Sequence, residues 1–144
     1  MNNLTYEHYH QHPFNKGVHF AAIPLIALTT TNFLDEFRIN MFSNKISIVK
    51  WSMIIFYVYQ YSKISPTTGL VMFYYFMILN KLSQHWKKSD RKWIRNSVAV
   101  FVLSWAIQFF GHYIEGRRPA LVDSISTAFF EAPLFSIKYL VNFD

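Results

Sequence analysis

Residues 17–34 read GVHFAAIPLIALTTTNFL and contain no formally charged side chain. A helix needs about 20 mostly apolar residues to cross a bilayer, with roughly 17 as the lower limit. This stretch therefore predicts a first transmembrane helix. A polar patch follows it directly and ends the apolar run, comprising Asp35, Glu36, Arg38 and Asn40.

Further apolar runs follow at residues 46–61, 67–80 and 96–110, with a weaker one at 124–143. Lys50 interrupts the second run near one end, where a long side chain can extend toward the lipid headgroups. Pro66 suits the opening turn of the third run. The pattern predicts an all-α, polytopic membrane protein with about four transmembrane helices and a C-terminal re-entrant or interfacial helix. Residues 1–144 are expected to form a single membrane-embedded domain.

The alternative is a soluble helical bundle whose core helices resemble membrane spans. Such a bundle would carry a polar stripe at helical spacing, and the first and third runs are expected to lack one. The composition also favours the membrane, because charged residues make up only 15% of the 144 residues, against roughly 25% in average proteins. Aromatic residues make up 19% of the chain, which excludes a disordered protein.

The absence of cysteine excludes disulfide frameworks, thiolate metal sites, iron–sulfur clusters and thiol catalysis. Any metal must therefore be held by His, Asp or Glu. The chain also contains neither of the glycine-rich motifs G-x-G-x-x-G and G-x-x-x-x-G-K-[ST], which argues against a nucleotide site.

The net charge of +6 is concentrated, since six of the 14 Lys and Arg residues lie between Lys81 and Arg95. Aromatic residues occupy the charge-free runs instead of alternating with these cations, so nucleic-acid binding is not expected. The positive-inside rule predicts that residues 81–95 form a cytoplasmic loop. We expect a multi-pass integral protein of the bacterial inner membrane or the endoplasmic reticulum, with membrane lipid as a partner. Four spans would then place the N-terminus and His112 on the opposite side.

The six histidines are unevenly distributed. Four lie near the N-terminus, one follows the run at 96–110, and one lies in the basic segment; they are His8, His10, His12, His19, His112 and His85. Four antiparallel spans would bring the N-terminal arm and the end of the fourth helix to one side of the membrane. This placement favours a functional role for His10, His19 and His112 taken together, and imidazole with carboxylate suits iron, zinc or copper.

Two nearby pairs extend this candidate site. Asn15 and His19 are four residues apart, and His112 and Glu115 are three apart, so each pair would share a helix face. Residues 9–19 read YHQHPFNKGVH, and residues 105–121 read WAIQFFGHYIEGRRPAL. The first segment resembles the motif Y-H-x-x-P-x-N-x-x-x-H, and the second resembles W-x-x-Q-F-x-G-H-x-x-E-x-[KR]-x-P-A-L. Together they resemble the membrane-bound 2-hydroxy fatty acid dioxygenase family.

This resemblance implies an Fe(II)-dependent dioxygenase that shortens a 2-hydroxy long-chain fatty acid by one carbon and consumes O2. It also implies that His10, His19 and His112 are the iron ligands. The resemblance assigns no role in the site to His12 or His85. Glu115 is expected either to bind the metal or to orient His112.

The remaining site residues are expected to contact the substrate. Arg117 or Arg118 would hold its carboxylate, with headgroup anchoring as the alternative role. Asn15 and Gln108 are candidate substrate-binding residues, and Gln108 could instead link helices inside the bundle. Two other functions stay open at this point: a non-enzymatic scaffold or transporter subunit, and a zinc-dependent membrane hydrolase.

Overall fold

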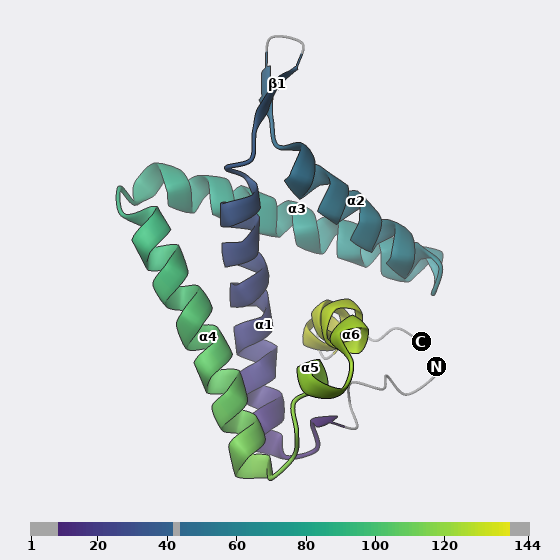
Figure 1. Ribbon diagram of the computed structural model, residues 1–144. Helices are drawn as coiled ribbons and strands as arrows, with labels where there is room; N and C mark the ends of the chain where they lie inside the picture. Colours follow the sequence, from purple (N-terminus) through teal and green to yellow (C-terminus); the bar gives the residue numbers. More distant parts are fainter. Residues whose placement is uncertain (1–8, 42–43, 139–144) are drawn as a thin grey trace. The chain divides into compact units, whose positions relative to one another are not determined.

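The computed structural model describes residues 9–41 and 44–138, and these are mostly helical (Figure 1). The helices are α1 (Pro13–Leu34), α2 (Ile48–Ser62), α3 (Pro66–Ser89), α4 (Trp93–Glu115), α5 (Ala120–Asp123) and α6 (Ile125–Lys138). A short antiparallel hairpin of β1 (Ile39–Met41) and β2 (Asn44–Ile46) joins α1 to α2. The weak C-terminal run thus forms α6, and its last residues, 139–143, lie outside the described residues.

The chain forms two compact units, one from residues 1–27 with 99–144 and one from residues 28–98. The first unit contains the start of α1, most of α4, and the helices α5 and α6. Its apolar core brings together Ile23 of α1, Ala120 of α5 and Phe135 of α6. Helix α6 is thereby packed against the segment of α1 that carries His19. The expectation of a single domain stays a prediction.

The second unit is built around the α2–α3 hairpin. Ser65 caps α3, because its hydroxyl accepts the Thr68 backbone N–H at 3.0 Å, and Pro66 occupies the first turn as predicted. Gly69 allows close approach of the two helices, since a Cβ there would lie 2.0 Å from the Ser62 Oγ and 2.9 Å from the Ser62 Cα. No side chain fits at Gly69 unless α2 moves.

The position of the Lys50 side chain differs from the sequence-based expectation. Its side chain does not extend toward headgroups but is buried, where the Nζ donates to Asp35 Oδ1 at 2.6 Å and to Asn80 Oδ1 at 2.8 Å. Asp35 also accepts from Lys87 at 3.0 Å and from Arg38. A buried ammonium is tolerated only when paired and hydrogen-bonded, and these partners from distant parts of the sequence supply the pairing.

Burial by itself would raise the pKa of Asp35, but hydrogen bonds from Lys50, Arg38 and Lys87 together outweigh it and lower the pKa to about 2. The carboxylate thus stays ionised and links the end of α1 to α2 and α3. Five charged residues form this network, and together with Asn80 we call them the Asp35 cluster. The charged residues are Asp35, Glu36, Arg38, Lys50 and Lys87.

Among the described residues, two helices are long and apolar enough to cross a membrane, namely α1 and α4. Four spans are therefore not confirmed: α2 has only 15 residues, and α3 is less apolar than α1 and α4. The basic segment also differs from expectation. It is not a long loop, because α3 continues to Ser89 and α4 begins at Trp93, which leaves a turn of three residues between them.

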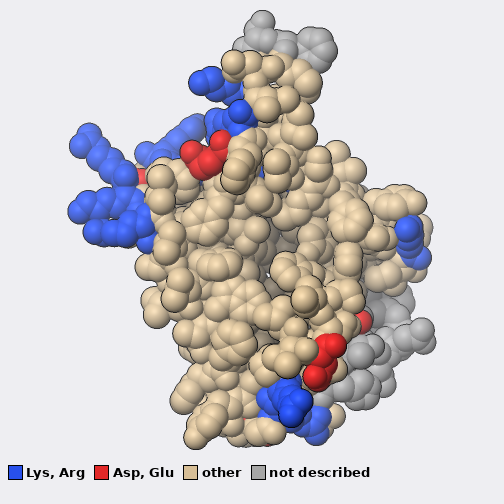
Figure 2. All heavy atoms as spheres, viewed as in Figure 1, with Lys and Arg blue, Asp and Glu red and all other residues tan. Residues whose placement is uncertain are grey.

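Helix α4 buries a stripe of polar side chains. Its buried residues include Ser97, Ser104, Gln108 and His112, whereas large apolar side chains such as Val102, Leu103, Ile107 and Phe110 are exposed. In Figure 2 the surface over the middle of α4 carries no charged side chain. Helix α1 also has a buried polar stripe, with Asn15, His19, Thr29 and Asn32, which the sequence analysis did not expect. In both helices the polar stripe is buried, whereas the polar stripe of a helix in a soluble bundle faces the solvent.

Candidate metal centre

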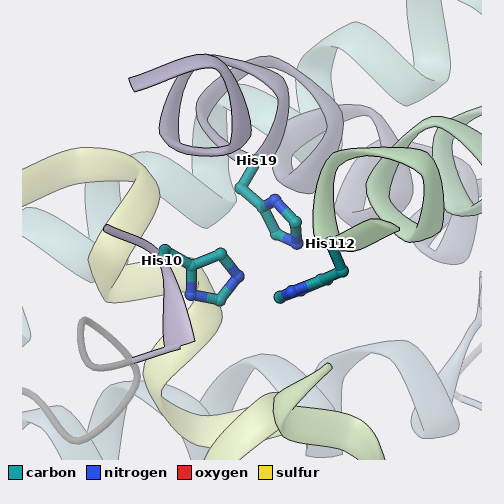
Figure 3. A group of neighbouring side chains, drawn as sticks. All are labelled: His10, His19 and His112. Atoms are coloured by element: carbon teal, nitrogen blue, oxygen red, sulfur yellow. The ribbon is translucent and has the colours of Figure 1, made fainter. Parts of the chain in front are cut away.

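Three histidines converge in the first unit (Figure 3). His10 precedes α1, His19 lies in its second turn, and His112 lies near the end of α4. The ring centroids are separated by 4.1 Å for His10–His19, 4.7 Å for His10–His112 and 4.8 Å for His19–His112. One nitrogen from each ring lies within 4.8 Å of the others, and all three side chains are buried. The structure therefore brings together the histidines that the sequence analysis selected.

Because α1 begins at Pro13, before Gly17, Asn15 and His19 lie on consecutive turns of one helix. The His19 Nδ1 lies 3.0 Å from the Asn15 carbonyl oxygen. A carbonyl oxygen can only accept a hydrogen bond. In a neutral His19 ring, the proton must therefore lie on Nδ1. The Nε2 lone pair is then available as a donor to a metal, which is the usual arrangement for a metal-binding histidine.

Glu115 connects the segment containing His10 to the end of α4. Its Oε1 accepts the backbone N–H groups of Gln11 at 2.7 Å and His12 at 3.1 Å. Its Oε2 accepts the Asn15 side-chain amide at 2.6 Å. Both carboxylate oxygens are thus engaged by N–H donors, two of which belong to the residues that directly follow His10.

Asn15 lies between Glu115 and His112. Its Nδ2 donates to Glu115 and lies 3.4 Å from the His112 Nδ1, so this amide links the carboxylate to the His112 ring. Gly111 makes room for Asn15: a Cβ at Gly111 would lie 2.4 Å from the Asn15 Oδ1. The absence of a side chain at Gly111 lets α1 approach α4 at the level of the histidines.

Gln108 lies one helical turn before His112 and is buried at 5% exposure. Its Nε2 has no hydrogen-bond partner among the described residues. Burying an amide donor without a partner costs free energy, so we expect an acceptor to bind beside the Gln108 Nε2. Because residues four apart share a helix face, Gln108 and His112 are directed to the same side of α4.

The two candidate arginines lie at the exposed edge of this unit, after the end of α4. Arg117 donates to the Gln11 side-chain oxygen at 3.2 Å, and its Nε lies 3.7 Å from Glu115 Oε1. Arg118 is exposed in the segment before α5.

The other histidines lie apart from the buried group. His12 is exposed and accepts the Phe14 backbone N–H at 3.2 Å, and His85 is exposed on α3. His8 lies outside the described residues.

Phe135 of α6 is a neighbour that the sequence analysis missed. Its ring centroid lies 5.3 Å from that of His10, and the side chain is fully buried. It forms an apolar wall beside His10. One phenylalanine among the 15 in the chain carries no signal that would single it out.

The donor set fits a transition metal. Three neutral imidazoles in a buried setting are a known ligand set for zinc, and imidazole also suits iron and copper. Three protein ligands also leave coordination positions free for a substrate. The cluster could therefore hold a metal ion, and its chemistry alone does not select which one.

Comparison with known proteins agrees with the two motifs. A family model described as 2-hydroxy-palmitic acid dioxygenase Mpo1-like matches residues 3–143. The chain is also 29% identical over 132 residues to the Saccharomyces cerevisiae protein named 2-hydroxy-palmitic acid dioxygenase MPO1. That alignment covers 90% of this chain and 72% of the yeast protein. No solved structure matches the chain.

Proposed function

This chain belongs to the 2-hydroxy-palmitic acid dioxygenase Mpo1-like family, and we propose that it is an Fe(II)-dependent dioxygenase of 2-hydroxy fatty acids. In the proposed reaction the carboxyl carbon leaves as CO2, and C2 becomes the carboxyl carbon of a fatty acid one carbon shorter. O2 is the four-electron oxidant, and the 2-hydroxy acid and O2 together give the shortened acid, CO2 and water. The observation that carries the proposal is the buried cluster of His10, His19 and His112.

These three histidines would hold the iron through ring nitrogens. When bound, iron supplies a Lewis-acidic, redox-active centre with open positions for a chelating substrate and O2. The protein orients the imidazoles and excludes water. The Asn15 carbonyl fixes the His19 tautomer, and Phe135 covers one side of His10 with an apolar ring.

We assign Glu115 a positioning role, in place of the metal-ligand role that the sequence left open. Both of its oxygens accept hydrogen bonds, and the donors include the backbone of the two residues that follow His10. Glu115 would therefore keep His10 beside the other two rings, with Asn15 completing the link to His112. Asn15 thus has a positioning role too, in place of the predicted contact with substrate.

For substrate binding we propose that the Gln108 Nε2 donates to an oxygen of the 2-hydroxy acid. The support is its buried amide without a partner, one turn from His112. Arg117 or Arg118 would attract the substrate carboxylate at the exposed edge of the unit. Guanidinium binds carboxylate through paired hydrogen bonds, and both arginines are exposed.

We also propose that the protein is a multi-pass membrane enzyme of the bacterial inner membrane or the endoplasmic reticulum. Helices α1 and α4 are the candidate spans. The hairpin α2–α3 also presents large apolar side chains outward, including Ile55, Phe56, Leu70, Phe73 and Ile78, so it would enter the bilayer as well. An acyl chain dissolved in the same bilayer could then reach the enzyme without crossing water.

The deciding experiment is metal analysis of protein purified without oxygen, paired with an assay on 2-hydroxypalmitate. We expect bound iron, and O2 uptake matched by formation of the acid one carbon shorter. Bound zinc with turnover that needs no O2 would instead identify a hydrolase. Protein without metal and without turnover would identify a scaffold.

A further inference from the structure

Positive side chains gather in the last three turns of α3, in the turn that follows it and in the first turn of α4. Five cations there are exposed, and we call them the basic cap; they are Lys81, Lys88, Arg91, Lys92 and Arg95. In Figure 2 the largest gathering of Lys and Arg lies over this turn. The cap belongs entirely to the unit of residues 28–98.

The carboxylate of Asp90, which lies in the turn itself, is occupied by other donors. It accepts the Trp86 indole N–H at 3.1 Å, the Lys92 backbone N–H at 2.8 Å and the Asn96 side-chain amide at 2.7 Å. Asp90 thus fixes the turn without forming an ion pair with a cap side chain. Within residues 9–41 and 44–138, none of the five cap residues has a carboxylate within ion-pair distance.

Lys87 behaves differently from the cap residues beside it. It pairs with Asp35 and Glu36, and its Nζ lies 4.5 Å from the centre of the Trp93 ring. The acidic residues of the Asp35 cluster are therefore used by Lys87, Lys50 and Arg38. The charge of the basic cap remains open to an external anion.

The cap lies at one end of a candidate membrane span, because α4 begins at Trp93 directly after the turn. Ile94 and Val98, in the first turns of α4, are exposed apolar residues. Trp86 and Trp93 are half-buried beside the cap. Cations and tryptophans at the end of a span are positioned at the level of the lipid headgroups.

We propose that the basic cap binds the phosphate groups of anionic phospholipids in the bilayer that α4 crosses. Clustered Lys and Arg next to a span attract anionic lipid, and each contributes roughly a fivefold gain in affinity. Lipid fits better than nucleic acid, because the tryptophans are half-buried and Lys87 lies over the Trp93 ring. Binding of single-stranded nucleic acid would need aromatic faces that are open for base stacking. The proposal rests on the membrane-spanning role proposed above for α4, and it is independent of the proposed reaction.

The test uses the tryptophans of the cap as reporters. In the full chain, Trp51→Phe and Trp105→Phe leave Trp86 and Trp93 as the fluorophores. This parent is reconstituted into phosphatidylcholine vesicles that contain the same minor fraction of either brominated phosphatidylglycerol or brominated phosphatidylcholine. We expect several-fold stronger quenching by the anionic lipid, and a loss of this preference as salt screens the charges.

The cap variant Lys88→Gln/Arg91→Gln should lose most of that preference. Its matched control, Lys45→Gln/Lys63→Gln, removes the same charge from exposed residues outside the cap and should keep it. Equal quenching by the two brominated lipids in the parent would overturn the proposal, as would an equal loss in both variants. Capture of an oligonucleotide by the parent, without any lipid preference, would assign the cap to nucleic acid instead.

Discussion

The Glu115 carboxylate accepts the backbone N–H of Gln11 at 2.7 Å, although the two residues are 104 positions apart in the sequence. This contact holds the segment before α1 against the end of α4. His10, directly before Gln11, is thereby kept within 4.7 Å of the His112 ring, measured between centroids. The histidine cluster therefore depends on a hydrogen bond made by a residue outside it.

Glu115→Gln should weaken metal binding without removing a histidine. A glutamine has one acceptor oxygen where the carboxylate has two, so it cannot serve both the backbone donors and the Asn15 amide. Removing a group that orients metal ligands typically costs 10–100-fold in affinity. Titration with Co²⁺ would measure both the affinity and the absorption bands that report the ligand geometry.

The matched control for Glu115→Gln is Glu36→Gln, which changes an exposed carboxylate in the other unit. Its Co²⁺ affinity and spectrum should equal those of the parent. An unchanged affinity and spectrum in Glu115→Gln would refute the positioning role. Failure of the parent itself to bind Co²⁺ would count against the metal centre as a whole.

His112→Ala should lose bound metal and turnover while remaining folded in detergent. His85→Ala should keep both, because His85 is exposed on α3 and substitutions at such sites usually change stability by less than about 0.5 kcal/mol. Metal content, turnover of 2-hydroxypalmitate and helical content would be measured side by side. Full iron occupancy in His112→Ala would mean that the cluster is only a packing arrangement.

Gln108→Leu should raise the KM for the 2-hydroxy acid while the metal content stays at the parent level. Leucine has a similar size but offers no N–H, so the substrate oxygen would lose its donor. A hydrogen bond to a charged group is worth about 1.5–3 kcal/mol, which corresponds to roughly a 10- to 160-fold change in kcat/KM. Unchanged kinetics would assign Gln108 to contacts between helices.

Several parts of the fold were predictable because they depend on local signals. The end of α1 at Leu34 and the start of α3 at Pro66 follow from a polar patch and a proline. The burial of Lys50 was not predictable, because its partners Asp35 and Asn80 lie 15 and 30 residues away. An isolated lysine near the end of an apolar run gives no sign of such partners.

The candidate metal centre was likewise predictable only in part. His10, His19 and His112 were selected by residue type and motif. The role of Glu115 was left open, because it depends on backbone N–H groups of Gln11 and His12 that every residue type except proline possesses. Such contacts leave no trace in the composition or spacing of a single sequence.

Gly111→Ala should destabilise the protein and loosen the metal centre. The added Cβ would lie 2.4 Å from the Asn15 Oδ1, so Asn15 must move away from Glu115 and His112. Overpacking of this kind typically costs about 1–3 kcal/mol.

Gly17→Ala is the matched control, because Gly17 lies inside α1 and a Cβ added there would meet nothing within 4 Å. It should stabilise the helix by up to about 1 kcal/mol. Thermal unfolding in detergent would compare the two, and equal effects would contradict the close approach at Gly111.

Acid should weaken the second unit through Asp35. Its pKa is about 2 in the folded protein and about 3.8 in an unfolded chain, so the folded state favours the ionised form. The resulting stabilisation is fully present above about pH 4, declines as the pH falls from about 4 toward 2, and is absent below that range. Unfolding would be followed between pH 6 and pH 2 in the parent and in Asp35→Asn, in steps of roughly half a pH unit. Asp35→Asn should be less stable at pH 6 and should lose less stability across the acid range. Equal slopes for the two proteins between pH 4 and pH 2 would show that Asp35 does not hold the ends of α1, α2 and α3 together through its charge.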